Sequence, residues 1–229
     1  MDKLTTDRPE TGSLTTPTLT MTTPTTATQP MTPLTTSHPL AHVPPLVARG
    51  LTASVVHRTV LELRGHFATL AARCPGLFPT LPNRTIPHTS WRALWLRPNA
   101  WLLSGPPDIS DDARHREMTD GPNDDPQSER WPELTRPVEE GLCRVFDLSH
   151  ARVCINLKGT ATAAVLAKGT PLDLRPHRFL EGHCARTWCA GFTVMLDRVE
   201  DGIDVYVDSS LAVAFWDWLG DAAVELRSA

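Results

Sequence analysis

Apolar and polar positions alternate most clearly in the second half of the chain. From Arg152 to Leu157 every second residue is apolar, and this period of two predicts a β-strand. Gly159 then predicts a turn. The alanine-rich run that follows predicts a short helix, capped by Thr160 at its start and by Gly169, in a left-handed conformation, at its end.

Two further apolar runs lie at 186–198 and 203–207. They are separated by Glu200-Asp201-Gly202, which predicts a β-hairpin. Ser209 or Ser210 is then expected to cap a last helix with one apolar face. The residues of that face are Leu211, Ala214, Phe215, Trp218, Leu219 and Ala222.

The first half of the chain has a less regular pattern. Ordered structure is expected from about Leu46, and the apolar residues at 55–63 fit either a strand or a short helix. Residues 91–103 predict two strands around a turn at Arg97-Pro98-Asn99. Together the elements predict an α+β fold in which antiparallel strands carry helices packed on one side.

Composition divides the chain into a leader and one domain. Residues 1–40 contain 15 threonines and 6 prolines and show no apolar periodicity, so residues 1–45 are interpreted as a disordered Thr/Pro-rich leader. Residues 46–229 are interpreted as one α+β domain. Within it, about 105–136 is rich in proline and aspartate and poor in large apolar residues, which predicts a mobile surface insertion.

Charge and cysteine content restrict the environment and the partners. The net charge of -4 and the pI near 6.1 provide no broad basic field, so no nucleic-acid partner is expected. No apolar run is long enough to span a membrane, and no secretory signal is recognisable. Five cysteines, without the dense spacing of a disulfide framework, favour reduced thiols. These features predict a cytoplasmic protein without a membrane partner.

Motif searches find no active site of a common type. The chain lacks the glycine fingerprint of dinucleotide sites, the P-loop, the Gly-x-Ser-x-Gly elbow and the His-Glu-x-x-His helix. We therefore expect no catalytic, cofactor-binding or metal-binding residues in this chain. The strongest metal candidate is His177, His183, Cys184 and Cys189, but its spacing matches no known zinc pattern, and buried structural thiols are the favoured interpretation.

A second cluster, Asp147, Ser149 and His150, contains the residue types of a catalytic triad. Residues so close in one segment point in different directions and seldom converge on one reacting atom. Hydrogen bonds from Asp147 and Ser149 to local backbone are the favoured interpretation.

Tryptophan is frequent, with seven residues against one tyrosine. Trp216 and Trp218 are two positions apart and cannot share one helix face. One of them is therefore expected to project away from the core, which makes this pair the candidate contact with another subunit.

Five motifs occur in a fixed order along the chain: WRALWLRPNAWLL (91–103), FDLSHARVCINLKG (146–159), VLAKGTPLDL (165–174), FLEGHCART (179–187) and LAVAFWDWL (211–219). The most specific part is Asp147-Leu148-Ser149-His150 followed, after a strand and a turn, by Leu166-Ala167-Lys168-Gly169 and Leu172-Asp173-Leu174. In this order the motifs resemble the gamma subunit of sarcosine oxidase, and the likeness covers about residues 50–226.

The resemblance implies a subunit without an active site of its own. In this family four subunits oxidise sarcosine with O2 and tetrahydrofolate to glycine, methylene-tetrahydrofolate and H2O2. The partners implied are the alpha, beta and delta subunits. FAD, FMN, NAD, tetrahydrofolate and zinc are implied to reside on those subunits, which leaves this chain a structural and assembly role.

The same order of motifs is also similar to the folate-binding N-terminal domain of the glycine-cleavage aminomethyltransferase (T-protein). In that family the segment carries the acid that acts on folate. Here the run from Thr187 to Asp197 offers no counterpart of that acid. A standalone folate-binding aminomethyltransferase-like protein is the alternative, and a generic interaction protein is the third possibility.

Overall fold

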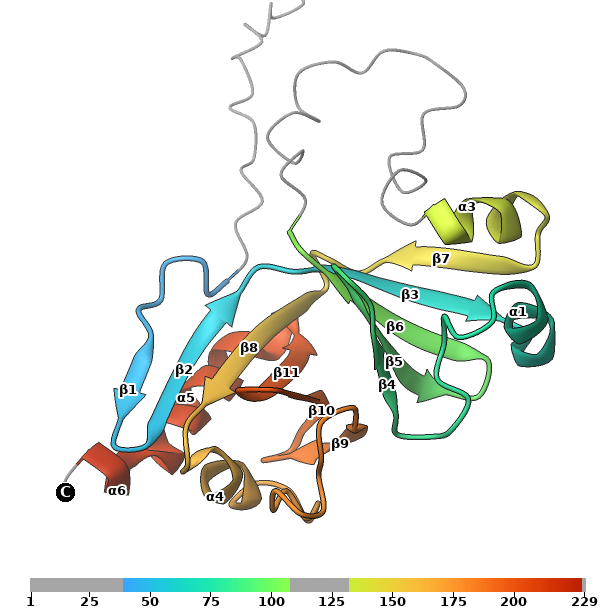
Figure 1. The fold of residues 1–229 in the computed structure, drawn as a ribbon. Helices are drawn as coiled ribbons and strands as arrows, with labels where there is room; N and C mark the ends of the chain where they lie inside the picture. The colour runs from blue at the N-terminus through green and yellow to red at the C-terminus, as the bar shows by residue number, and fades with distance from the viewer. Residues whose placement is uncertain (1–38, 108–131, 228–229) are drawn as a thin grey trace, which may run out of the picture. The chain divides into compact units, whose positions relative to one another are not determined.

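The fold was analysed in a computed structural model, which describes residues 39–107 and 132–227. Most of the predicted leader and the middle of the predicted insertion lie outside these residues. The remainder of the chain forms two antiparallel sheets with helices on their outer faces (Figure 1).

The first sheet has six strands in the order β1-β2-β8-β11-β10-β9, and every neighbouring pair is antiparallel. Side chains on both faces of the central strands are buried, because helices cover one face of the sheet and the second sheet covers part of the other. The strands are β1 Leu46–Ala48, β2 Leu51–Val56, β8 Arg152–Lys158, β9 Cys184–Cys189, β10 Phe192–Val199 and β11 Gly202–Asp208.

The second sheet has five strands in the order β4-β5-β6-β3-β7, again antiparallel throughout. Its centre is the β5–β6 hairpin, whose turn places Asn99 at a φ of 61°. The predicted hairpin at 91–103 is thereby confirmed. The strands are β3 Thr59–Gly65, β4 Thr85–Pro87, β5 Arg92–Arg97, β6 Ala100–Gly105 and β7 Cys143–Asp147.

The chain passes from one sheet to the other between β2 and β3 and again between β7 and β8. At this point the Leu148 amide donates to the Val60 carbonyl at 2.8 Å, and the Val60 amide donates to the Ser149 hydroxyl at 3.1 Å. The Asp147 carboxylate accepts a 2.8 Å hydrogen bond from the Ser149 amide. The predicted local backbone role is confirmed for Asp147. Ser149 instead accepts from the backbone of Val60, 89 positions away, and this bond holds the two crossings side by side.

Most of the helices are short. The longest, α5, supplies much of the apolar core beside the first sheet. The helix α5 buries Ala212, Phe215, Leu219 and Ala222 against the first sheet. The other helices lie along the edges and outer faces of the two sheets (Figure 1). The helical elements are α1 Phe67–Arg73, α3 Pro132–Glu139, α4 Thr162–Ala167, η2 Ser209–Leu211, α5 Ala212–Ala222 and α6 Val224–Arg227.

Three apolar clusters hold these layers together. One lies between the first sheet and α4 and α5, and another lies between the second sheet and α1 and α3. The third joins the two sheets. It contains Val60, Leu94, Leu102, Cys154, Cys184, Met195 and Tyr206. The α+β class with antiparallel sheets is confirmed.

Two predicted caps of α4 are wrong. The residue before the helix is Ala161, and no side chain caps its start. Gly169 is not among the described glycines with positive φ. A Cβ at Gly169 would lie 2.7 Å from the Trp218 ring, so this position needs glycine because the ring packs against its backbone. The sequence around α4 cannot indicate that the ring of Trp218, from α5, will pack against Gly169.

Other boundaries also shift. The apolar run at 186–198 is two strands joined at Ala190-Gly191, both with positive φ, while the predicted hairpin at Glu200-Asp201-Gly202 is confirmed as the β10–β11 connection. The last helical segment is capped one residue early, because the Asp208 carboxylate accepts from the Ser210 amide at 3.1 Å. The end of the predicted insertion is the helix α3, whose Leu134 is buried.

Phe215 is the test of the first core. Its ring is fully buried and packs edge-on against Phe192, so Phe215→Ala should reduce the free energy of unfolding by about 3–5 kcal/mol. The control Val213→Ala, at an exposed position of the same helix, should change it by less than about 0.5 kcal/mol. Urea unfolding followed by circular dichroism measures both, and equal effects would contradict this placement of the core.

Candidate functional site

The face of the first sheet that points toward the second sheet carries polar side chains in rows. Because neighbouring strands are in register, side chains of β8, β11, β10 and β9 stand beside one another on this face. One row is Asn156, Asp204, Asp197 and Cys184, and it lies beneath the second sheet. We call this row and its partners from the second sheet the interior polar cluster.

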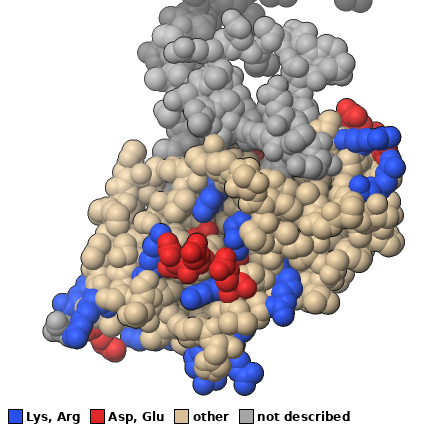
Figure 2. Space-filling model, viewed as in Figure 1, with Lys and Arg blue, Asp and Glu red and all other residues tan. Residues whose placement is uncertain are grey.

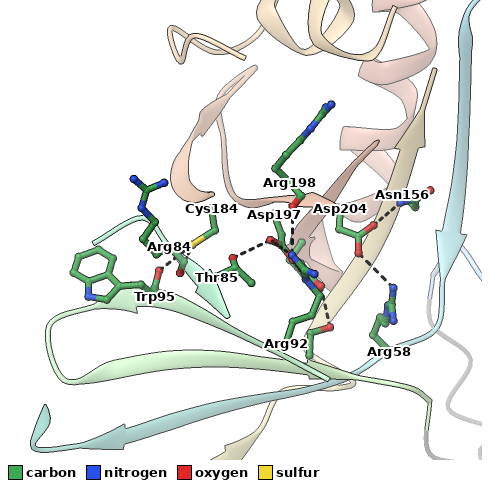
Figure 3. A network of polar contacts seen from close by, with 12 residues as sticks. Arg58, Arg84, Thr85, Arg92, Trp95, Asn156, Cys184, Asp197, Arg198 and Asp204 are labelled. Atoms are coloured by element: carbon green, nitrogen blue, oxygen red, sulfur yellow. Dashed lines mark hydrogen bonds and ion pairs between the residues drawn. The ribbon is translucent and has the colours of Figure 1, made fainter. Parts of the chain in front are cut away.

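Asp197 is the centre of the cluster and is fully buried. The Arg92 guanidinium holds its carboxylate with two contacts, Nε to Oδ2 at 2.6 Å and Nη2 to Oδ1 at 3.1 Å (Figure 3). The Thr85 hydroxyl donates to Oδ1 at 2.9 Å. A forked, charge-assisted pair of this kind fixes direction as well as distance, so it positions β4 and β5 over β10.

Asp204 lies directly opposite Asp197 in the β10–β11 ladder, which places two carboxylates side by side on one face. The Asn156 amide donates to Asp204 at 2.5 Å, and Arg58 Nη2 lies 3.5 Å from the same carboxylate. Burial raises the pKa of Asp197 above its ordinary value, and the charge of Asp204 adds to the rise, while Arg92 and Thr85 oppose it. Arg92 and Arg58 therefore compensate the repulsion between the carboxylates of Asp197 and Asp204.

Hydrogen bonds around Cys184 join the β4 segment to the start of β9. The Cys184 amide donates to the Asn83 carbonyl at 3.1 Å, and its thiol donates to the Arg84 carbonyl at 3.1 Å. The Thr85 amide donates to the Gly182 carbonyl at 2.8 Å. With no solvent access to Asp197, this cluster cannot present its carboxylate to a substrate, and its role is to join the two sheets.

Beyond the covered row, the same face opens into a groove of about 710 Å³ between the two sheets. We call it the arginine groove. Four arginines line it: Arg64 and Arg97 from the second sheet and Arg152 and Arg186 from the first. The lining carboxylates are Glu62, which binds both Arg64 and Arg97 at 2.6 Å, and Asp208, which binds Arg152 at 2.7 Å.

The apolar part of the groove includes Met195, Leu102, Leu211 and Trp188. The Trp188 side chain is 64% exposed, although it is among the largest apolar groups of the chain. Sequence reasoning missed this residue. The available signal was the alternation Cys184, Arg186, Trp188, because residues two apart on a strand share one face.

Trp216 and Trp218 are both half-buried and pack against the first core. The Trp218 ring lies 5.4 Å from the Phe215 ring, centroid to centroid. Neither ring projects fully from the fold, and among the described tryptophans the exposed one is Trp188. Their contact with another subunit stays a prediction.

The four residues of the zinc candidate do not converge. Cys184 faces the second sheet, whereas Cys189 lies in the core on the opposite face of the first sheet. Burial raises the pKa of each thiol to about 11, so both are protonated at neutral pH. Within residues 39–107 and 132–227, no cluster of three or more His, Cys, Asp or Glu side chains could hold a metal ion.

Surface charge agrees with the composition. On the face of the described residues shown in Figure 2, basic side chains lie scattered and interleaved with acidic ones. Among the described helices, none has the length and apolar character required to cross a membrane.

Comparisons with known proteins agree with this architecture. The family model for the sarcosine oxidase gamma subunit matches residues 134–225. The sarcosine oxidase subunit gamma of Corynebacterium sp. (strain U-96) is 29% identical over 178 residues, which are 75% of each chain.

A solved structure shows the same fold. A chain of the heterotetrameric sarcosine oxidase from Corynebacterium sp. U-96, in complex with pyrrole 2-carboxylate, superposes with a TM-score of 0.67 at 24% identity, covering 84% of this chain and 97% of that one. The glycine cleavage system aminomethyltransferase T from Bartonella henselae gives a TM-score of 0.49 at 15% identity, covering 75% of this chain and 46% of that one.

The two packed antiparallel sheets thus define an α+β chain of the kind found in a heterotetrameric sarcosine oxidase. The sequence matches confirm the resemblance seen in the motifs. The chain is similar to the sarcosine oxidase gamma subunit family, through the family model that matches residues 134–225 and the relative that is 29% identical.

The Arg92–Asp197 pair should be essential for stability. Asp197→Asn leaves the partly buried guanidinium without its counter-charge, and this should reduce the free energy of unfolding by about 3–5 kcal/mol. Asp173→Asn is the matched control, because Asp173 also forms a forked pair, with Arg175, but at the exposed surface. Chemical denaturation measures both variants. A control that loses as much stability as Asp197→Asn would refute the role of burial.

Thiol reactivity tests the burial of the cysteines. Burial raises the pKa of Cys143 to about 11, as for Cys184 and Cys189, and that of Cys154 well above its ordinary value. Only Cys74 is partly exposed. Iodoacetamide at pH 8 should therefore modify Cys74 first, and peptide mass spectrometry should find the other four modified only after unfolding. Early modification of Cys184 would contradict its burial between β4 and β9.

Proposed function

We propose that this chain acts as the gamma subunit within a heterotetrameric sarcosine oxidase and serves assembly rather than chemistry. The observation that carries the proposal is the match to a sarcosine oxidase gamma subunit over three quarters of both chains. The partners proposed are the alpha, beta and delta subunits. FAD, FMN, NAD, tetrahydrofolate and zinc are assigned to those partners.

The geometry of the polar residues supports an assembly role. The carboxylate at the centre of the interior polar cluster, Asp197, has both oxygens held by Arg92 and Thr85 and is closed to solvent. A general acid or base must reach the proton that it transfers. A buried ion pair between two sheets instead favours one docking geometry of those sheets.

The candidate contact surface from the sequence is Trp216 and Trp218. Both rings keep part of their surface on α5 accessible, and tryptophan is enriched among the residues that dominate binding energy at protein interfaces. Trp218 also packs against Gly169, so a substitution there affects folding as well as any contact. Trp216 is the better position for testing an interface on this helix.

The alternative, a standalone folate-binding aminomethyltransferase-like protein, is less favoured. The sequence matches are to gamma subunits. The run from Thr187 to Asp197, where that enzyme family carries its acid, forms β9 and β10, and its only carboxylate is the buried Asp197.

Co-purification tests the proposal. The tagged full-length chain, expressed in its native host, should elute as a yellow complex with three additional chains and should support sarcosine-dependent H2O2 formation. The absorption spectrum, the subunit composition and a peroxide assay give the three readouts. A colourless chain that elutes alone and binds tetrahydrofolate would replace this proposal with the transferase alternative.

A further inference from the structure

We propose that the arginine groove binds an acidic segment of another subunit of the complex. This inference rests on the proposed function and adds the surface at which one partner docks and the chemistry of that partner. It is argued from three properties of the groove: its charge, its exposed apolar surface and its form.

The charge of the groove is incompletely compensated. Its lining has four arginines and two carboxylates, so the excess is two positive charges in a chain whose net charge is -4. Arg64 and Arg97 share the single carboxylate of Glu62, and both contact the same oxygen. Arg186 is exposed and forms no ion pair with any residue in the described ranges. A carboxylate from outside the chain would complete this arrangement.

Exposed apolar surface lies beside these charges. Trp188 is 64% exposed and Leu211 is 42% exposed, and both line the groove. Arg186 lies two positions from Trp188 on β9, so a guanidinium and an aromatic ring point from one strand into the groove. Tryptophan and arginine are the residues most enriched at the energetic centres of protein interfaces.

The form of the groove favours a polypeptide segment. Its walls come from two sheets, with Leu102 and Arg64 on one side and Met195 and Arg186 on the other. The volume of about 710 Å³ accommodates several side chains. A segment that combines carboxylates with apolar side chains matches both the guanidinium groups and Trp188.

The first test is co-purification with charge variants. The tagged chain, co-expressed with its partner subunits, is compared with Arg186→Glu, Arg186→Lys and the control Arg178→Glu, whose arginine is exposed outside the groove. Arg186→Glu should reduce the flavin retained per gamma chain about tenfold or more, whereas Arg186→Lys and Arg178→Glu should stay near the original value. Circular dichroism confirms that each variant folds.

The second test identifies the occupant. Lysine occurs at only three positions, Lys3, Lys158 and Lys168, and neither Lys158 nor Lys168 lines the groove. Carbodiimide treatment of the complex that contains Arg186→Lys should join the new amine to an aspartate or glutamate of another subunit, which mass spectrometry locates. The same treatment of Arg178→Lys should give no such link.

The outcomes separate this inference from the function on which it rests. If the unaltered chain retains no partner subunits, the proposed function fails. If it retains them and Arg186→Glu does so equally well, the function stands and the groove is not the docking surface. Cross-links from position 186 only to carboxylates of the gamma chain itself would also overturn the inference, because the occupant would then be a segment of this chain.

Discussion

The buried ion pair between Arg92 and Asp197 is the interaction on which the arrangement of the two sheets depends. A carboxylate that loses all contact with water is strongly unfavourable unless its charge and its hydrogen-bonding capacity are both matched. Arg92 and Thr85 supply that match from the second sheet, at distances of 2.6–3.1 Å. Only one placement of the second sheet over β10 satisfies these contacts. Apolar packing around Tyr206 would tolerate small slips, whereas the forked ion pair does not.

The same face of the first sheet changes its character along the strands. Near the β10–β11 turn it is covered, and its charges are paired within the chain. Toward Trp188 and Asp208 the cover ends, and the face becomes the lining of the arginine groove. One sheet therefore performs two tasks: internal cohesion where the second sheet packs on it, and presentation of charge and aromatic surface where the two sheets enclose the groove. The proposed assembly role needs both, since a contact surface is useful only on a rigid support.

Backbone-level features were largely predictable. The strand at Arg152–Lys158, the hairpin at Pro98-Asn99 and the last helix all follow from local periodicity and turn chemistry, which depend on neighbours in the sequence. The errors concern contacts between distant segments. The local sequence predicts a left-handed cap at Gly169, whereas the glycine is required by the Trp218 ring, 49 positions away. The sequence favours Trp216 or Trp218 as the exposed ring, whereas the exposed one among the described tryptophans is Trp188, which lines the groove between the two sheets.

The sequence by itself determined the α+β class, the antiparallel pairing, the local backbone role of Asp147 and the likeness to sarcosine oxidase gamma subunits, because these depend on periodicity, on short-range hydrogen bonds and on the order of motifs. Only the tertiary structure decided which of the many charged residues matter. Arg92 and Asp197 are 105 positions apart, and Arg64 and Arg186 are separated by most of the domain. No local pattern indicates that two such residues will face each other, because their approach is fixed by how the two sheets pack and not by either segment alone.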